Sequence, residues 1–427
     1  MKNSGIEWVG DIPDDWNIIK IKYVLQERVE NNSPIRTKNI LSLTAQQGVV
    51  PIAEKTGGGN KPKEDYSDYR LAYPGDIVMN SMNILSGSVG LSKYFGCVSP
   101  VYYMLRPRDK NFDVRFFNYI FQSTVFQKSL YGLGNGILMK ESGNGKLNTI
   151  RMRIPMDKFG SLYIPVAPVE EQERIAEFLD KKCGEIDGLT ADIKTQVQTL
   201  EQYKRSVITE AVTKGLNPSA EMKESGVDYI GIMPIEWRLL KLKYILSEIN
   251  IRSKTGEEDL LSVSQYRGVI LATENRMRTM QAESLIGYKL VQINDLVFNK
   301  LNPSLARFGC SAYNGITSPD FAVYRPNNFA ITKYLEYLLK TDKYAMQYAR
   351  MAGGVGDGFS RLYTNQLYEI KVALPKLSEQ KEIVDYLDNK CAQIDELISA
   401  KQSQIEMLES YKKSLIYEYV TGKKEVV

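Results

Sequence analysis

Residues 169–207 read VEEQERIAEFLDKKCGEIDGLTADIKTQVQTLEQYKRSV, and residues 377–415 read LSEQKEIVDYLDNKCAQIDELISAKQSQIEMLESYKKSL. The two stretches align without a gap, so the chain contains the same long segment twice. Apolar residues in both stretches alternate between spacings of three and four, which is typical of a helix with one narrow apolar seam. The seam positions are Cys183, Ile186, Thr190, Ile193, Val197, Leu200, Lys204, Val207 and, just beyond the first stretch, Ala211, with Cys391, Ile394, Ile398, Lys401, Ile405, Leu408, Lys412 and Leu415 in the second.

Flanking residues indicate where the two helices end. Each begins after a proline, Pro168 or Pro375, and ends near a glycine, Gly215 or Gly422. About 42 residues at ~1.5 Å per residue give a rod of roughly 63 Å. Each seam needs a partner, and the simplest partner is the other helix of the chain. The pair could fill a core and nothing more, or a second exposed seam could bind a helix of another subunit.

A second repeat opens each half of the chain. Residues 4–25 and 225–246 are identical at nine of 22 positions, including Trp16 and Trp237. Between opener and helix lie Gly/Pro-punctuated regions that also align, with Asp76 facing Asp295. We expect strands at 77–80, 88–96, 101–105, 296–299 and 321–325 and short helices at 116–127 and 333–341. The sequence therefore predicts two similar α+β domains with divergent loops, each followed by a long helix.

Composition removes several classes of function. A chain of 427 residues is too long for one core, and its net charge of +4 is weak evidence for nucleic-acid binding. It has no apolar run of ~20 residues and no signal-peptide core, and its four cysteines form no C-x-x-C pair, which together predict a cytoplasmic protein without a membrane span. Because the chain has no histidine, Ser-His-Asp and Cys-His catalysis are excluded.

Motifs for catalysis or cofactor binding are missing. There is no G-x-x-x-x-G-K-[ST] and no N-P-P-Y-like tetrapeptide, and Gly132, Gly134 and Gly136 do not fit G-x-G-x-x-G. Glu170 and Glu171, at the start of the first helix, are interpreted as capping and dipole partners. We expect no catalytic residue, no metal site and no cofactor on this chain.

Glycine loops followed by arginine are the best candidates for a DNA contact. Glycine allows backbone to approach a phosphate, arginine binds guanine edges or phosphates, and asparagine can read adenine. The alternative is a surface loop beside a structural arginine, and an asparagine at a strand end is more often a turn residue. The candidate DNA-binding residues are Asn80, Asn83, Lys146, Arg151, Arg153, Asn299, Lys300, Arg307 and Arg361.

The tandem order of these blocks resembles the specificity subunit of type I restriction–modification systems. The resemblance covers essentially the whole chain. It rests on the openers at 10–16 and 231–237 and on the closers at 168–175 and 377–383, each of which leads into a long helix with Leu-Asp and Ile-Asp pairs. The resemblance implies two target recognition domains and two helices that pack antiparallel as a coiled-coil spacer, with an internal pseudo-two-fold repeat.

The resemblance also implies a division of labour. Each recognition domain would read half of a bipartite double-stranded DNA target, and methyltransferase subunits would dock on the conserved region. Restriction subunits would join them, and S-adenosylmethionine, ATP and magnesium would belong to these partners. On this basis the chain divides into recognition domain 1 (1–167), helical spacer 1 (168–215), a linker (216–224), recognition domain 2 (225–375) and helical spacer 2 (376–427).

Two other classes of function stay open at this point. The chain could be a self-contained nuclease or methyltransferase, although no length is left over for a catalytic domain. It could also be a scaffold whose paired domains bind proteins and no DNA. The target sequence, the spacer length and the stoichiometry are not encoded in any pattern that we recognise.

Overall fold

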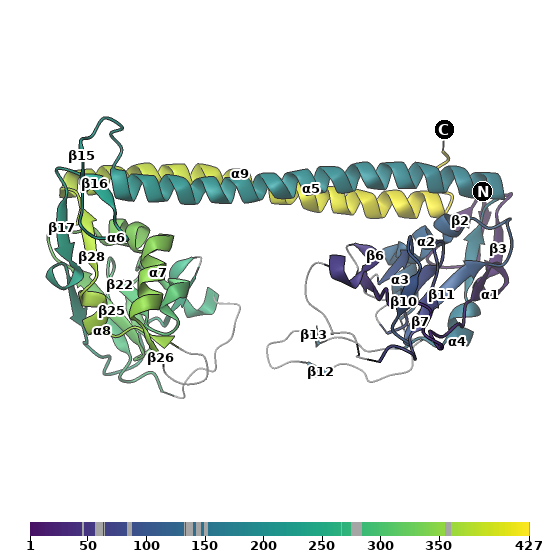
Figure 1. Cartoon of the computed structure of the whole chain (residues 1–427), viewed down its shortest axis with the longest axis horizontal. Helices are drawn as coiled ribbons and strands as arrows, with labels where there is room; N and C mark the ends of the chain where they lie inside the picture. The colour runs from purple at the N-terminus through teal and green to yellow at the C-terminus, as the bar shows by residue number, and fades with distance from the viewer. Residues whose placement is uncertain are drawn as a thin grey trace. The chain divides into compact units, whose positions relative to one another are not determined.

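The computed structural model describes residues 1–426 apart from 45–46, 56–62, 64, 83–87, 132, 134–139, 142–146, 149–152, 266, 275–283 and 355–359. The chain folds into two compact units. Unit 1 comprises Met1–Ile193 and Ser403–Val427, and unit 2 comprises Lys194–Gln402. Each unit thus holds one α+β domain, half of the first long helix and half of the second (Figure 1).

The elements of the first α+β domain occur in the order that the second then repeats. Its strands are β1 (Lys2–Asn3), β2 (Asp11–Ile12), β3 (Asn17–Lys20), β4 (Leu25–Glu27), β5 (Leu41–Thr44), β6 (Gly48–Pro51), β7 (Arg70–Ala72), β8 (Ile77–Asn80), β9 (Val89–Leu91), β10 (Gly96–Val98), β11 (Tyr102–Pro107), β12 (Lys140–Glu141), β13 (Leu147–Asn148) and β14 (Tyr163–Val166). Its helices are α1 (Ile21–Val24), the 3-10 helix η1 (Ile52–Glu54), α2 (Val114–Gln122), α3 (Thr124–Ser129) and α4 (Met156–Gly160), followed by the long helix α5 (Val169–Lys214).

The second domain is built from β15 (Met222–Glu224), β16 (Ile232–Pro234), β17 (Arg238–Lys241), β18 (Leu246–Ile249), β19 (Leu261–Ser264), β20 (Gly268–Leu271), β21 (Lys289–Val291), β22 (Leu296–Asn299), β23 (Phe308–Cys310), β24 (Gly315–Thr317), β25 (Phe321–Pro326), β26 (Gly353–Gly354), β27 (Ser360–Arg361) and β28 (Lys371–Leu374). Its helices are η3 (Leu242–Tyr244), η4 (Ala272–Glu274), η5 (Pro303–Leu305), α6 (Thr332–Leu339), α7 (Asp342–Met351) and α8 (Thr364–Tyr368), followed by the long helix α9 (Leu377–Val420).

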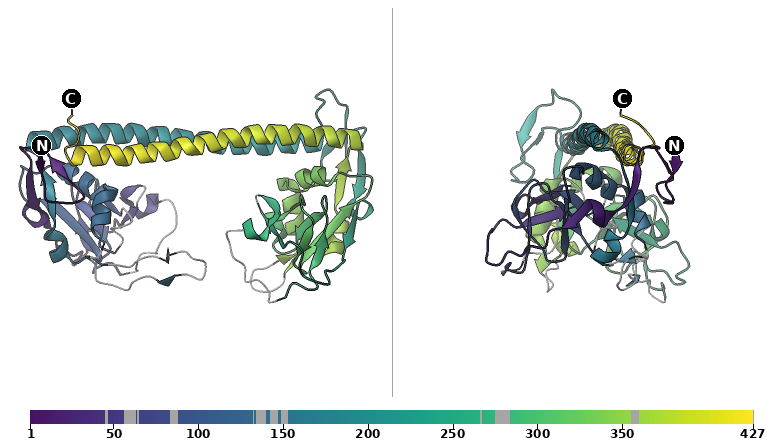
Figure 2. Two further views of the ribbon diagram at one scale, coloured as in Figure 1. Left: turned by 180° about the vertical axis from the view of Figure 1, so that it is seen from behind. Right: turned by 90° about the vertical axis from the view of Figure 1, so that its right-hand side faces the viewer.

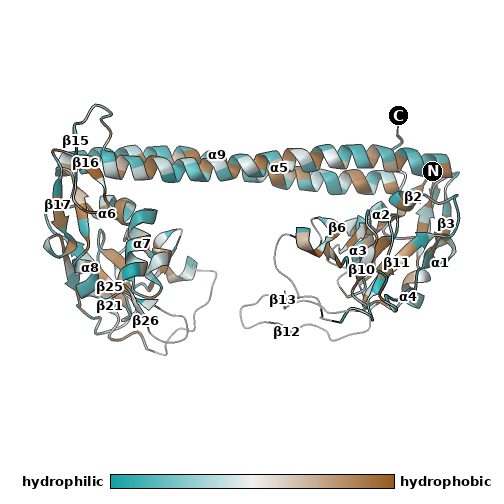
Figure 3. Ribbon diagram, viewed as in Figure 1, coloured by the Kyte–Doolittle hydropathy of each residue, from teal (hydrophilic) through white to brown (hydrophobic). Residues whose placement is uncertain are grey.

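Each domain has a four-stranded antiparallel sheet with the same topology. The strand order is β4-β11-β8-β9 in unit 1 and β18-β25-β22-β23 in unit 2. In both domains a two-stranded pair joins the opener to the strand before the long helix, with β3 on β14 and β17 on β28. Apolar residues gather in the strands of each unit, where they form the cores (Figure 3). The predicted α+β repeat is therefore confirmed.

Two local predictions in the first domain were wrong. The stretch 88–96, expected as one strand, is split, because Val89–Leu91 pairs with β8 whereas Gly96 pairs with Ala72 of β7. The stretch 116–127, expected as one helix, breaks at Ser123. The backbone of Ser123 is extended, and its hydroxyl oxygen accepts a hydrogen bond from the Phe126 amide at 3.3 Å, which caps the next helix.

The two long helices pack antiparallel within each unit (Figure 2). In unit 2, Lys204 of α5 contacts Asp395 of α9 at 2.6 Å, and the amide oxygen of Gln196 accepts a hydrogen bond from Lys401 at 2.5 Å. Residue numbers therefore decrease along α5 in the direction in which they increase along α9, as antiparallel packing requires. Unit 1 has the same arrangement, with Asp187 of α5 against Lys412 of α9 at 2.7 Å. Every predicted seam position is buried or half-buried.

Each domain is fixed to a long helix through the tryptophan of its opening block. The indole of Trp16, fully buried, donates to Glu171 at 2.9 Å, and that of Trp237 donates to Glu379 at 3.1 Å. Burial beside the indole raises the pKa of Glu171 above its usual range. Glu171 lies in the first turn of α5, as expected, but it also anchors the opening block.

Candidate nucleic-acid interface

The strand-end asparagines are turn residues. The Asn80 side-chain oxygen accepts a hydrogen bond from the Met82 amide at 3.0 Å, and that of Asn299 accepts one from the Leu301 amide at 2.9 Å. Each side chain thus stabilises the turn that follows its own strand. The two domains place these residues at matched positions, but their side-chain oxygens already accept hydrogen bonds from backbone amides of the same chain. The alternative that treated them as turn residues therefore describes their contacts within the chain.

Arg153 and Arg361 occupy equivalent places in the two domains. The residue after each arginine is buried, and its amide donates a hydrogen bond to the equivalent loop of its own domain. The Ile154 amide donates to the Ser81 carbonyl at 3.2 Å, and the Leu362 amide donates to the Lys300 carbonyl at 3.0 Å. The side chain of Arg153 is exposed and makes no hydrogen bond or ion pair among the residues that the structure describes. It is therefore available to a ligand.

Arg361 is less exposed than Arg153 and has partners within its own domain. Its guanidinium lies 3.6 Å from the carboxylate of Asp320 and 5.7 Å from the ring centre of Tyr363. Its Nε is buried and has no hydrogen-bond partner in the described part of the chain. The backbone around it is paired, since Arg361 bridges to Leu301.

A cluster of charges surrounds Arg361. Lys289, almost fully buried, donates to the carbonyl of Phe321 at 2.8 Å and lies 3.5 Å from Glu248. Glu248 also accepts a hydrogen bond from Thr364 at 2.7 Å. Lys300 is half-buried nearby, and burial together with repulsion from Lys289 and Arg361 lowers its pKa. We call Lys289, Lys300, Arg361, Glu248 and Asp320 the unit 2 charge cluster.

Unit 1 has only part of this cluster. Arg70 of β7 pairs with Glu27 of β4 at 2.6 Å, which matches the pair of Lys289 with Glu248. Ser81 and Val101 stand at the positions of Lys300 and Asp320 in the repeat alignment. Lys289 and Glu248 were not among the residues predicted from the sequence, although the repeat alignment places Lys289 opposite Arg70.

A buried aspartate in each sheet is neutralised by an arginine from a different strand. Asp76 binds Arg28 at 2.8 Å, and Asp295 binds Arg325 through two hydrogen bonds at 2.7 and 2.9 Å. Arg28 lies just after β4, whereas Arg325 lies on β25. The aligned aspartates are therefore structural, and Arg28 and Arg325 are their counter-ions.

The remaining predicted residues are either half-buried or not described. Arg307 is half-buried, and its backbone carbonyl accepts a hydrogen bond from Asn299. Asn83, Lys146 and Arg151 lie outside the described residues. The structure thus brings together Lys300 and Arg361 in unit 2 and leaves Arg153 exposed in unit 1.

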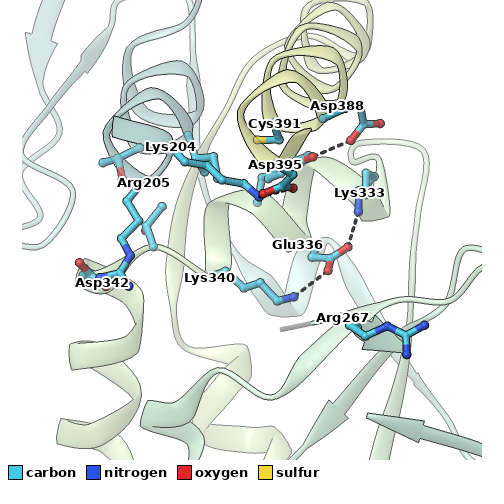
Figure 4. A pocket seen from close by; sticks show the side chains of 15 residues that line it. Lys204, Arg205, Arg267, Lys333, Glu336, Lys340, Asp342, Asp388, Cys391 and Asp395 are labelled. Atoms are coloured by element: carbon cyan, nitrogen blue, oxygen red, sulfur yellow. Dashed lines mark hydrogen bonds and ion pairs between the residues drawn. The ribbon is translucent and has the colours of Figure 1, made fainter. Parts of the chain in front are cut away.

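Unit 2 has a pocket of about 430 Å³ where its domain meets the two helices. Figure 4 shows Lys333 and Lys340 converging on Glu336, with Lys204 against Asp395. Both lysines hold the pKa of the buried Glu336 below its usual range, against the effect of burial. Three lysines of the pocket are therefore paired with carboxylates that also line it.

The same junction is repeated in unit 1. The hydroxyl of Tyr119 donates to Asp180 of α5 at 2.7 Å, and that of Tyr337 donates to Asp388 of α9 at 2.6 Å. Within the described ranges no group of His, Cys, Asp and Glu side chains is placed to hold a metal ion, and no helix there is long and apolar enough to span a membrane.

The sequence of this chain matches a known protein family and several of its members. Residues 13–199 and 270–407 match the family described as the type I restriction modification DNA specificity domain. The type I restriction enzyme MjaVIII specificity subunit of Methanocaldococcus jannaschii is 24% identical over 96% of this chain and 93% of its own length. The EcoKI specificity subunit of Escherichia coli is 23% identical over 78% of this chain and 71% of its own length.

Solved structures show the same fold at low identity. A chain from a structure of the assembly and conformational transition of the type I R-M system superposes with a TM-score of 0.68 and 13% identity, over 97% of this chain and all of that chain. The HsdS subunit of Thermoanaerobacter tengcongensis gives a TM-score of 0.52 at 13% identity, over 99% of this chain and all of its own. Because the family match covers both repeats and most of the chain, this protein belongs to the type I restriction–modification DNA specificity family.

Proposed function

We propose that this chain is the DNA-recognition subunit of a type I restriction–modification complex, in which each α+β domain reads one half of a bipartite target. The observation that carries this proposal is the same scaffold with different side chains at matched positions. Ser81 is replaced by Lys300, and Val101 by Asp320, while the surrounding backbone bonds are kept. Two readers of this kind can bind two unlike half-sites of duplex DNA.

The chain itself contributes recognition and no chemistry. The lack of histidine and of nucleotide-binding motifs supports this assignment. Partner subunits would bring S-adenosylmethionine for adenine methylation and would use ATP and magnesium for translocation and cleavage. Four free thiols are consistent with a reducing cytoplasm, where the target DNA also lies.

The helix pair would hold the two domains at a fixed separation and bind methyltransferase subunits. Support comes from exposed apolar side chains that occur twice, at matched positions. Leu189 and Tyr411 in unit 1 are 54% and 55% exposed, and Leu397 and Tyr203 in unit 2 are 53% and 48% exposed. Paired patches of the same composition fit two copies of one partner.

Loss of one patch tests this docking. We expect Leu397→Asp with Tyr203→Arg to remove one methyltransferase copy from the complex, because an apolar contact becomes charged. Native mass spectrometry of the co-expressed proteins would count the copies. Gln202→Arg, an exposed change on the same helix, is the control. An unchanged copy number in the double variant, with the control also unchanged, would show that the partner binds elsewhere.

Binding and methylation assays test the proposed function itself. The chain co-purified with its methyltransferase should select one bipartite sequence from random duplexes and methylate adenines in it, whereas the pure chain should show no methyl transfer, cleavage or ATP hydrolysis. A chain that assembles with protein partners but selects no sequence would be a scaffold. Turnover by the highly purified chain alone would make it an enzyme.

A further inference from the structure

The guanidinium of Arg361 is only partly open to a ligand. Reading a guanine edge takes two parallel N–H groups that point into the groove. In Arg361 the Nε is buried within the domain, and one terminal nitrogen lies 3.6 Å from the carboxylate of Asp320. The pair formed by Nε and a terminal nitrogen is therefore closed to a base, whereas the outer end of the guanidinium can exchange Asp320 for another anion.

The unit 2 charge cluster also carries more positive than negative charge. Its cations are Lys289, Lys300 and Arg361, and its carboxylates are Glu248 and Asp320. Glu248 is committed to Lys289 and Thr364. Asp320 is the ion-pair partner of Arg361, and its side chain is 70% exposed. An exposed carboxylate at this distance is a weak partner that a stronger anion can replace.

Unit 1 lacks the feature. Arg153, the equivalent of Arg361, is exposed, and Val101 stands where unit 2 has Asp320. The counter-ion therefore belongs to unit 2 and is not part of the shared scaffold.

We propose that Arg361 and Lys300 bind a DNA phosphate, and that Asp320 is the counter-ion which this phosphate displaces. The proposal rests on the proposed function and names the chemistry of one part of that interface. Asp320 weakens DNA binding on every sequence, because a phosphate must compete with it. Arg361 positions the unit 2 domain on the backbone of the duplex and carries no sequence information.

Removal of the counter-ion tests the proposal most sharply. In the complex with its methyltransferase, Asp320→Asn should raise affinity roughly two- to fivefold, the range of an exposed ion pair. The gain should be equal on target and non-target duplexes. Asp228→Asn is the matched control, because it removes the same charge from an exposed site in the opening block of unit 2.

Substitution of Arg361 separates a phosphate contact from a base contact. Arg361→Ala should weaken binding equally on all duplexes and reduce the salt slope by about one. Arg361→Lys should keep most of the affinity, because a lysine can bind a phosphate but cannot make a bidentate base contact.

Three results would overturn the proposal. The first is a DNA affinity of Asp320→Asn that is no higher than that of Asp228→Asn. The second is a loss of affinity in Arg361→Ala that is confined to duplexes with one half-site. The third is a loss of sequence specificity in Arg361→Lys. All three are read against a native complex that selects its target. A native complex without sequence preference would instead contradict the proposed function.

Discussion

At the scale of single residues, a buried glutamine at the start of each long helix joins the helix to its domain. Gln172 accepts a hydrogen bond from the Asp113 amide at 2.9 Å and donates to the Ala167 carbonyl at 2.7 Å. Gln380 accepts one from the Ile331 amide at 2.8 Å and donates to the Phe329 carbonyl at 2.8 Å. Both side chains are almost fully buried.

Removing either glutamine should destabilise its unit. Gln172→Ala or Gln380→Ala leaves a backbone amide and carbonyl groups buried without partners, which costs about 1–3 kcal/mol per group. Urea unfolding followed by circular dichroism would measure the loss. Gln404→Ala, at an exposed position on α9, should change stability by less than about 0.5 kcal/mol. Equal losses in the buried and exposed variants would contradict these contacts.

Three buried or half-buried thiols should be slow to react. Burial raises the pKa of Cys97, Cys183 and Cys310 to about 11, so at pH 8 their thiolate fraction falls about a hundredfold below that of an ordinary thiol. Iodoacetamide should therefore modify the native chain far more slowly than the urea-unfolded chain. Because the folded pKa is the higher one, this contribution to stability is full below about pH 9 and is lost as pH rises towards 11. Equal labelling rates would show that the thiols are accessible.

Part of the candidate site could be predicted from the sequence, and part could not. Arg153 and Arg361 lie equally far before their long helices in the sequence, and matched backbone bonds confirm that they are equivalent. This spacing could not show that one arginine is exposed and the other held by Asp320, because Asp320 is far from Arg361 in sequence. The contacts of Asn80 and Asn299 were foreseeable, since they are local to a turn.

At the scale of elements, the seams of α5 and α9 were readable from spacing alone. Heptad spacing is a local pattern, and all seam positions are buried or half-buried. The pairing of β3 with β14 was not readable, because it joins residues far apart in sequence through backbone bonds that leave no mark in composition. The break at Ser123 was missed because the apolar pattern continues on both sides of it.

The seam should be most sensitive where its side chains are fully buried. Ile394 is 3% exposed, whereas Ile193 is half-buried. Ile394→Ala should therefore cost about 2–5 kcal/mol, and Ile193→Ala should cost less. Urea titrations of both variants would compare them. A larger loss at Ile193 would show that burial of the seam positions does not decide their contribution to stability.

At the scale of the whole molecule, each compact unit draws on both ends of the repeat. The sequence division into domains at 1–167 and 225–375 and spacers at 168–215 and 376–427 follows the order of elements, whereas the units cut through both helices. Leu415 and Val420 near the end of α9 are buried in the core of unit 1, and Val212 near the end of α5 is buried in that of unit 2. The burial of each helix end in the other unit could not be predicted from local sequence patterns, because it depends on which halves of the two helices pair.

The central claim is that the two domains are interchangeable readers of two separate half-sites. Their boundaries are structurally equivalent, since the Ile21 amide bonds to Leu162 at 2.9 Å and the Leu242 amide bonds to Ile370 at 2.8 Å. Residues 246–370 can therefore be replaced by a second copy of residues 25–162 without changing the openers or the helices.

The most direct test is selection of random duplexes by the methyltransferase complex of this chimera, beside the native complex. We predict that the native complex selects two different half-sites separated by unread base pairs, and that the chimera selects the unit 1 half-site twice. A chimera that assembles with its methyltransferase yet keeps the native target, or a native complex that selects one uninterrupted sequence, would contradict the claim that each domain reads its own half-site.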